Sequence, residues 1–254
     1  MITRKKSNII STASVSHFTN FNSLCKIIES RCFLPHYCLE NCDYLNWDKV
    51  VGQKLPKFKE PPRLANPMVC FTDLPHDKWK VHKRRYGNFV ITLTEEWKLR
   101  KELSPVIYLT RNDILSNSLL PQCIRLASIG VDYLKKINYP DADGYNNFAN
   151  LLLEFVKLYE DDDVRYYDER EWRYVPWRGL DGLPLCLPIE DFDKREIYHK
   201  IIWADDKNKL YFDFKDIENI EVKTEKQQKK VIQRLMISFE ITEKEARKKV
   251  KINT

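Results

Sequence analysis

Apolar and polar positions along the chain form short strand-like runs separated by a few helical stretches. Apolar residues at 24, 27 and 28 predict a helix, with Asn20 or Asn22 as its cap and the segment 31–35 as its end. A second, short helix is expected to begin after Thr94. Runs of apolar and β-branched residues predict strands around His17 and at 68–72, 88–93, 106–109, 171–175, 201–203 and 219–222.

The middle and the end of the chain have helical periodicity. Between 113 and 159 the pattern is helical, and positions 151, 152, 155, 156 and 159 form one apolar face. Two C-terminal helices are predicted from capping boxes at Thr224–Gln227 and Thr242–Glu245. The segment 48–67 contains several Lys and Pro residues and little periodicity, so we expect a surface loop there.

Strands and helices follow each other without regular alternation, which favours an α+β fold with a mixed β-sheet. We expect one α+β domain at 1–222, in which 113–159 is a helical insertion, followed by a basic helical segment at 223–254. No internal repeat and no low-complexity linker interrupts this order.

Composition excludes several classes of nucleotide-binding protein. The 254 residues include only six glycines, and their spacing matches none of the glycine-rich phosphate-binding loops. A P-loop NTPase, a Rossmann dinucleotide fingerprint and a kinase glycine-rich loop are therefore excluded by their usual motifs. The apolar fraction of 43% is sufficient for a packed core.

The net charge of +6 lies in one part of the chain. Residues 223–251 contain ten Lys or Arg and four Glu, so residues 1–222 are neutral overall. The basic segment has two interpretations: its side chains bind nucleic-acid phosphates, or they form an ordinary solvated helix face.

Neither an export signal nor a metal site is predicted. Positions 11–14 are Ser-Thr-Ala-Ser where a signal peptide would be apolar, and no stretch approaches the ~20 apolar residues of a spanning helix. We therefore expect a cytoplasmic protein that does not contact membranes. The seven cysteines are expected to be reduced, and no second ligand pair accompanies Cys38 and Cys42, so no metal is expected.

Two glutamates in a predicted strand are candidate catalytic groups. Glu169 and Glu171 are two residues apart, which in a strand places them on the same face. Such a pair can orient a hydroxyl and stabilise developing positive charge, and it can equally belong to a ladder of salt bridges along a strand edge. Spacing alone favours the salt-bridge interpretation.

Several short motifs, taken in order, resemble those of one known family. They are His17-Phe18-Thr19, Arg31-x-Phe33-Leu34-Pro35, Pro67-Met68-Val69-Cys70-Phe71-Thr72-Asp73-Leu74-Pro75, Tyr86-Gly87-x-Phe89-x-Ile91-x-Leu93, and Glu169-Arg170-Glu171-Trp172-Arg173-Tyr174. Together these motifs resemble the AbiGi-type abortive phage infection proteins over roughly residues 14–240, with Leu74 where the family has Ile. This resemblance implies a protein of phage defence in a toxin–antitoxin module.

That family in turn resembles the ADP-ribosyltransferase-like fold of DarT-type and CmdT-type toxins. The second resemblance implies that NAD is the substrate, that Glu171 is the catalytic carboxylate with Glu169 as its partner, and that His17 holds the ribose. The positions implied to bind NAD are His17, Thr19, Tyr37, Phe71, Thr72 and Tyr86. Cys70 stands where such folds often have a hydroxyl residue.

The implied activity is transfer of ADP-ribose from NAD to a nucleic acid or a protein. A carboxylate near the ribose stabilises the oxocarbenium-like cation that forms when nicotinamide leaves. Members of the AbiGi grouping are also described as antitoxins. The alternatives are therefore a non-catalytic interaction protein with a cognate toxin, and a nucleic-acid-binding regulator.

Overall fold

The computed structural model describes residues 12–54, 62–137, 153–176 and 187–253. Its helices and strands, in chain order, are β1 (Val15–Thr19), α1 (Phe21–Ser30), β2 (Cys32–Phe33), β3 (His36–Asn41), α2 (Trp47–Val51), β4 (Arg63–Thr72), α3 (Trp79–Tyr86), β5 (Phe89–Leu93), α4 (Glu95–Arg100), β6 (Ser104–Pro105), β7 (Ile107–Leu109), α5 (Leu120–Lys136), β8 (Val156–Leu158), β9 (Glu171–Tyr174), β10 (Leu187–Pro188), α7 (Arg195–Ala204), β11 (Leu210–Tyr211), β12 (Ile217–Val222), α8 (Glu225–Phe239), α9 (Glu243–Lys249) and β13 (Val250–Ile252). Short 3₁₀ turns include η2 (His76–Lys78) and η4 (Tyr166–Glu169), and η3 (Leu115–Leu119) is a π-helical turn.

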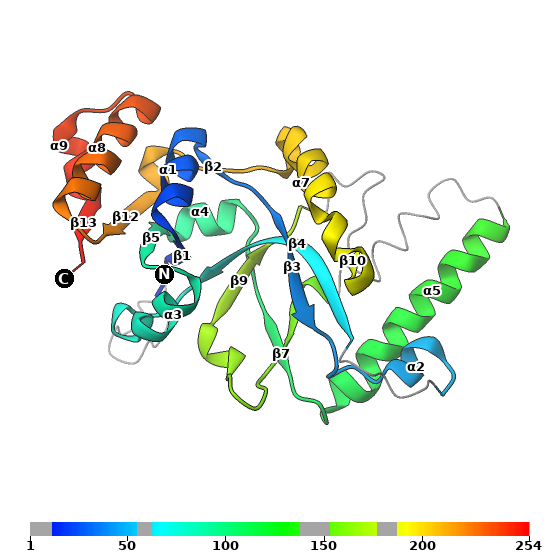
Figure 1. Ribbon diagram of the computed structural model, residues 1–254. Coiled ribbons are helices and arrows are strands. Elements are labelled where there is room, and N and C mark those ends of the chain that lie inside the picture. The colour runs from blue at the N-terminus through cyan, green and yellow to red at the C-terminus, as the bar shows by residue number, and fades with distance from the viewer. Residues whose placement is uncertain (1–11, 55–61, 138–152, 177–186, 254) are drawn as a thin grey trace, which may run out of the picture.

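One mixed sheet organises the described residues, with the strand order β13-β12-β5-β1-β4-β9-β6 (Figure 1). β3 and β10 pair with the first half of β4, while the second half of β4 pairs with β9. β12 and β13 are parallel, whereas β1 is antiparallel to both of its neighbours. The predicted α+β class with a mixed sheet is confirmed.

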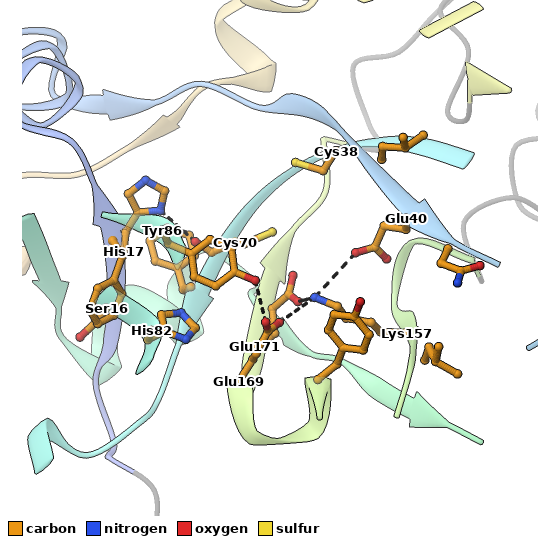
Figure 2. A pocket seen from close by; sticks show the side chains of 16 residues that line it. Ser16, His17, Cys38, Glu40, Cys70, His82, Tyr86, Lys157, Glu169 and Glu171 are labelled. Atoms are coloured by element: carbon orange, nitrogen blue, oxygen red, sulfur yellow. Dashed lines mark hydrogen bonds and ion pairs between the residues drawn. The ribbon is translucent and has the colours of Figure 1, made fainter. Parts of the chain in front are cut away.

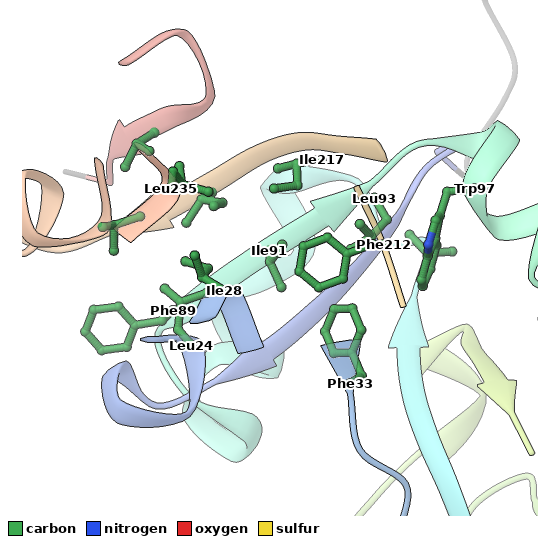
Figure 3. Packing of buried hydrophobic residues seen from close by; sticks show 14 of the residues in the cluster. Leu24, Ile28, Phe33, Phe89, Ile91, Leu93, Trp97, Phe212, Ile217 and Leu235 are labelled. Atoms are coloured by element: carbon green, nitrogen blue, oxygen red, sulfur yellow. The ribbon is translucent and has the colours of Figure 1, made fainter. Parts of the chain in front are cut away.

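Side chains of β5 alternate between two apolar layers, as expected for a pleated strand. Phe89, Ile91 and Leu93 point into the main core, where α1 and α8 cover the sheet (Figure 3). Val90 points to the opposite face and packs in a smaller cluster with Phe18, Leu74 and Trp79. Helix α3 thereby lies on the other side of the sheet from α1, against β1.

Local sequence signals account for several helix starts. The Asn20 side chain accepts a hydrogen bond from the Ser23 amide and caps α1, as predicted. Both predicted capping boxes are formed, at the starts of α8 and α9. The basic C-terminal segment is continuous with the sheet, because α8 packs on α1 and β13 adds a strand beside β12.

Three sequence-based predictions of secondary structure are wrong in part or in full. Residues 201–203 are helical within α7, because His199 and Ile202 on one face of the helix are buried. Residues 156–158, predicted to be helical, form β8, which pairs in parallel with β7. In the segment 48–67 that was predicted as a loop, α2 and the start of β4 are regular, while 55–61 lie outside the described residues.

Candidate functional site

A cavity of about 310 Å³ lies beside the point where β1 and β4 diverge. β1 pairs with β5 over its whole length but meets β4 only at Ser16 and Thr72. Side chains of β1, β3, β4, β8 and β9 reach the cavity, and α3 and η4 complete its wall (Figure 2). The lining residues are Ser16, His17, Phe18, Cys38, Leu39, Glu40, Asn41, Cys70, Phe71, His82, Tyr86, Lys157, Leu158, Tyr166, Glu169 and Glu171.

An ammonium group surrounded by carboxylates dominates the polar wall of the cavity. Lys157 Nζ lies 2.8 Å from an oxygen of Glu169 and 2.8 Å from an oxygen of Glu171, and 3.9 Å from Glu40 Oε1 (Figure 2). Burial opposes the charged form of Lys157, but Glu171, Glu40 and Glu169 outweigh it and raise the pKa of the lysine well above its ordinary value. The lysine is therefore a fixed positive charge.

Arg173 is a second cation that fixes Glu171. Its side chain is fully buried, with Nε 2.8 Å from Glu171 Oε1 and Nη2 2.6 Å from Glu40 Oε1. Burial acts to raise the pKa of Glu171, but Arg173 and Lys157 hold it well below its usual range. Glu171 is thus an ionised carboxylate of fixed orientation at the cavity wall.

Glu169 is held by a different set of donors. The Tyr86 hydroxyl donates to Glu169 Oε1 at 2.6 Å, and Arg85 Nη1 donates to the same oxygen at 3.2 Å. Burial, together with the charge of Glu169, raises the pKa of the Tyr86 hydroxyl above its ordinary value, so the phenol remains a donor. The Tyr86 side chain is nevertheless partly open to solvent, since the residue is 44% exposed.

The prediction that Glu169 and Glu171 share one strand face is wrong in its geometry. Glu169 ends the 3₁₀ turn η4, and Arg170 adopts a left-handed conformation with φ of 46° before β9 begins at Glu171. The Arg170 side chain is held by Asp73, whose carboxylate it contacts at 2.6 Å. The two glutamates converge because both bind Lys157, and the alternation of a strand does not bring them together.

His17 lies at the edge of the cavity, on the first strand of the sheet. Its Nδ1 is 2.8 Å from the carbonyl oxygen of Cys70, and its ring packs against Phe33 and Phe71. Burial lowers the pKa of His17, and the hydrogen bond to Cys70 opposes this only in part. The imidazole is therefore neutral at pH 7, with one nitrogen engaged by the backbone.

The other predicted binding residues divide between the cavity and its surroundings. Phe71 lines the cavity, although its ring is also part of the main core. Thr72 is behind the wall, where its hydroxyl donates to the backbone oxygen of Glu169 at 2.6 Å. Thr19 is buried in β1 and does not line the cavity. Tyr37 packs in a separate cluster against Tyr198 and His199, also away from the cavity.

Four further residues complete the site without having been predicted from sequence. Lys157 and Glu40 carry no local signal, because their partners are remote in sequence. His82 lines the cavity from α3, with its ring 4.6 Å from that of Tyr86. Arg173 could have been found, since it is two residues from Glu171 in a predicted strand and so lies on the same face.

Among the residues that the structure describes, no cluster of His, Cys, Asp and Glu is arranged to hold a metal ion. The described helices also include none that is long and apolar enough to cross a membrane. The polar part of the site is a charge-balanced network in which the carboxylates of Glu40, Glu169 and Glu171 bind Lys157, Arg173 and Arg85. Phe18, Phe71 and His17 also line the cavity.

Comparison with known proteins places the chain in a family. The family model described as "Putative abortive phage resistance protein AbiGi, antitoxin" matches residues 31–223. A protein of Lactococcus lactis subsp. cremoris named abortive phage resistance protein AbiGi is 28% identical over 215 residues, which cover 74% of this chain and 81% of that protein. No solved structure matches the chain. The family match spans most of the sequence and includes β4 and β9 with their cavity residues, and the chain therefore belongs to the AbiGi family.

Proposed function

We propose that the protein is a phage-defence enzyme that transfers ADP-ribose from NAD to an acceptor in the cavity beside Glu171. Membership of a family of abortive phage resistance proteins supports the role in defence. One observation carries the enzymatic part of the proposal. A carboxylate that is buried, ionised and fixed by two cations lies at the wall of a cavity that the neutral His17 also lines.

The proposed chemistry needs such a carboxylate. The bond between the ribose C1′ and the nicotinamide nitrogen breaks, its electron pair leaves with nicotinamide, and positive charge develops on the sugar. The acceptor then forms a bond to C1′ and releases its proton to water. A preorganised carboxylate stabilises the sugar cation, and the 2′-hydroxyl can donate a hydrogen bond to it.

The cations that hold Glu171 do not prevent this role. Arg173 Nε donates to Oε1 at 2.8 Å, whereas Oε2 accepts from Lys157 Nζ at 2.8 Å and from Arg173 Nη2 at 3.5 Å. In the proposal the ribose 2′-hydroxyl therefore donates to Oε1, which has a second lone pair. The two cations also keep Glu171 ionised, so the carboxylate does not have to lose a proton before it can stabilise the sugar cation. Phe18, Phe71 and the His17 ring, which also line the cavity, would supply apolar surface for the nicotinamide.

The cavity volume limits how much of NAD could be enclosed. About 310 Å³ is at the lower end of the ~300–1,000 Å³ range of ligand pockets. In the proposal the cavity takes the nicotinamide ribose, and the adenosine half extends toward solvent. Catalysis requires only the nicotinamide ribose to be fixed relative to Glu171.

The test compares two glutamates that share the same cationic partners. Glu171→Gln should lower transfer from labelled NAD by about 10²–10³, the typical effect of removing one preorganised electrostatic contact. Glu40→Gln is the matched control, because Glu40 also binds Arg173 and lies near Lys157. It should perturb folding to a similar extent and leave transfer within about tenfold. Equal activity of the Glu171 variant and wild type, or no NAD binding by the wild type in calorimetry, would refute the proposal.

A second candidate function is binding of a cognate toxin, and helix α5 favours it. The description of the family model includes the word antitoxin. Helix α5 projects from the sheet (Figure 1), and its side chains Leu126, Ile129 and Tyr133 are 67%, 52% and 63% exposed. Charged substitutions at Leu126 and Tyr133 should abolish phage protection if this function is correct, while Glu171→Gln should leave protection intact. The enzymatic proposal predicts the reverse.

A further inference from the structure

A two-stranded sheet of β7 and β8 lies next to the start of β9. Its strands are parallel, with Tyr108 of β7 opposite Lys157 of β8. A backbone hydrogen bond of 2.8 Å from the Ile107 amide to the Phe155 carbonyl holds this register. Residues opposite each other on adjacent strands project to the same side of a sheet, and here both side chains reach Glu171. The Lys157 ammonium binds its carboxylate at 2.8 Å (Figure 2), and the Tyr108 hydroxyl accepts a hydrogen bond from its backbone amide at 2.9 Å.

The backbone of Glu171 is turned away from β4 by its place in the antiparallel pair of β4 and β9. The Asp73 amide donates to the carbonyl of Arg170 at 3.4 Å, and Glu171 is the next residue of the ladder. Hydrogen-bonded and non-hydrogen-bonded pairs alternate along such a ladder, so the amide and the carbonyl of Glu171 point to the other side. There the carbonyl accepts from the Val106 amide at 3.0 Å, and the amide donates to the Tyr108 hydroxyl. Val106 and Tyr108 therefore satisfy both backbone groups of Glu171.

The acceptor of this amide is a hydroxyl whose position and charge are fixed. The ring of Tyr108 packs edge-on against Tyr167, with centroids 5.4 Å apart, and Tyr167 stacks on Tyr159 at 5.0 Å. Burial raises the pKa of the Tyr108 hydroxyl above its ordinary value. The hydroxyl therefore stays neutral and brings no further negative charge next to the Glu171 carboxylate. Since Glu171 is buried, an amide without this acceptor would lose the hydrogen bond that water supplies in the unfolded chain.

Glu171 is consequently held both by its side chain and by its main chain. Lys157 and Arg173 bind the carboxylate, whereas Tyr108 binds the main chain from which that side chain extends. Because Tyr108 and Lys157 are opposite each other, they place the main chain and the carboxylate relative to the same pair of strands. A displacement of about 1 Å can cost about 10²-fold in rate, so the placement of the main chain matters for a group that stabilises a sugar cation.

We propose that Tyr108 is a positioning residue: its hydroxyl holds the Glu171 amide and thereby keeps the carboxylate in place at the cavity wall. Tyr108 is not one of the described residues that line the cavity, so it acts through Glu171 and not by contact with a substrate. Its effect on transfer rests on the proposed function, whereas its contact with Glu171 can be measured without NAD.

The test variant is Tyr108→Phe, which keeps the ring and removes only the hydroxyl. The matched control is Tyr167→Phe. The Tyr167 ring packs directly against Tyr108, the residue is 48% exposed, and its hydroxyl has no hydrogen-bond partner among the residues that the structure describes. The control thus changes the same aromatic cluster without removing the acceptor of the Glu171 amide.

The first measurement is amide hydrogen exchange, followed by NMR on the full ¹⁵N-labelled chain without NAD. In Tyr108→Phe the Glu171 amide loses its acceptor and should exchange at least about tenfold faster than in wild type. The Ile91 amide of β5, a strand inside the sheet, reports general destabilisation, and the acceleration at Glu171 should exceed any acceleration there. Tyr167→Phe should leave the exchange of the Glu171 amide unchanged.

The second measurement is steady-state transfer from labelled NAD. Tyr108→Phe should lower kcat by about 10–100-fold while KM stays within about twofold of wild type, because the hydroxyl positions the carboxylate and does not contact the substrate. Tyr167→Phe should have the kcat and KM of wild type.

An unchanged exchange rate of the Glu171 amide in Tyr108→Phe, or an equal acceleration at Ile91, would overturn the proposal. A wild-type kcat in Tyr108→Phe, a similar fall of kcat in Tyr167→Phe, or a change confined to KM would do the same. If wild type transfers nothing from NAD, the proposed function is refuted, and the exchange measurement alone then decides whether Tyr108 positions Glu171.

Discussion

Replacing Lys157 by Met should destabilise the protein strongly at neutral pH. The substitution keeps the aliphatic part of the side chain and removes the ammonium group that two carboxylates contact at 2.8 Å. At an effective dielectric constant of about 20, each of these contacts corresponds to about 6 kcal/mol of Coulomb attraction. Desolvation of the buried ions offsets much of this gain. Removing one partner of a buried ion pair typically costs about 3–5 kcal/mol, and we expect a loss in that range.

A double-mutant cycle separates the ion pair from general disruption of the cavity. Once Lys157 is Met, Glu171 keeps Arg173 as its one cationic partner, so the additional change Glu171→Gln should cost less than it does in wild type. The coupling between the two substitutions should be about 1–3 kcal/mol, as for residues in one network. Urea unfolding followed by circular dichroism measures each free energy of unfolding.

The destabilisation should depend on pH in a defined direction. In the unfolded chain the pKa of a Glu is about 4.3, and in folded wild type the pKa of Glu171 is lower. The stability that this difference contributes is present above about pH 4.3 and is lost as the pH falls below that value. In the Lys157→Met variant, repulsion among Glu40, Glu169 and Glu171 should raise a carboxyl pKa above that of the unfolded chain. Such a group stabilises the folded variant as the pH falls. The difference in free energy of unfolding between wild type and the Lys157→Met variant should therefore become smaller from pH 7 to about 5.

The control for this experiment is Lys80→Met, which removes an exposed lysine of α3 and should change stability by no more than about 0.5 kcal/mol. A loss below about 1 kcal/mol for Lys157→Met would show that the network is weakly coupled to folding. A difference in free energy of unfolding that stays constant between pH 7 and 5 would show that the carboxylates of the Lys157→Met variant do not repel one another. Either result would refute the reasoning from geometry.

Three further predictions concern other parts of the fold. Thr224→Ala removes the cap of α8 and should lower stability by about 1 kcal/mol in urea unfolding; no change would mean that the cap is replaced by solvent. Gly87→Ala places a Cβ against the backbone of Thr19 at a positive φ, so we expect a loss of about 1–3 kcal/mol and a lower melting temperature. Burial lowers the pKa of His82 to about 4. The unfolded chain binds this proton near pH 6.5, so wild type should lose stability from about pH 6.5 to 4 and His82→Gln should lose less; parallel curves for the two proteins would contradict this.

Much of the fold could be predicted from local sequence because its signals are local. Capping residues bind amides three positions away, so Asn20, Thr224 and Thr242 mark their helices without tertiary information. The apolar run at 201–203 is ambiguous between strand and helix, and burial of its neighbour His199 decides for helix. The length of this run and the turn residues beside it do not distinguish a strand from a helix.

The candidate site was predictable only where its residues lie in strands of recognisable pattern. His17 and Glu171 were identified as members of motifs, and both reach the cavity. Lys157 and Glu40 were not, because each meets Arg173 or Glu171 only after β3, β8 and β9 have come together in the folded chain. An ion pair between residues that are so far apart in the sequence leaves no periodic pattern from which it could be predicted.

The order in which the strands are synthesised has a consequence for the nascent chain. β1 and β5 can pair early, but β12, the other neighbour of β5, follows roughly 120 residues later, which at ~5–20 residues per second means on the order of 10 s on the ribosome. During that time Ile91 and Leu93 have neither α8 above them nor β12 beside them, although both are fully buried in the finished protein. A premature stop before residue 217 would leave this apolar edge permanently uncovered. Truncated products should therefore be cleared by proteases or chaperones instead of accumulating as folded fragments.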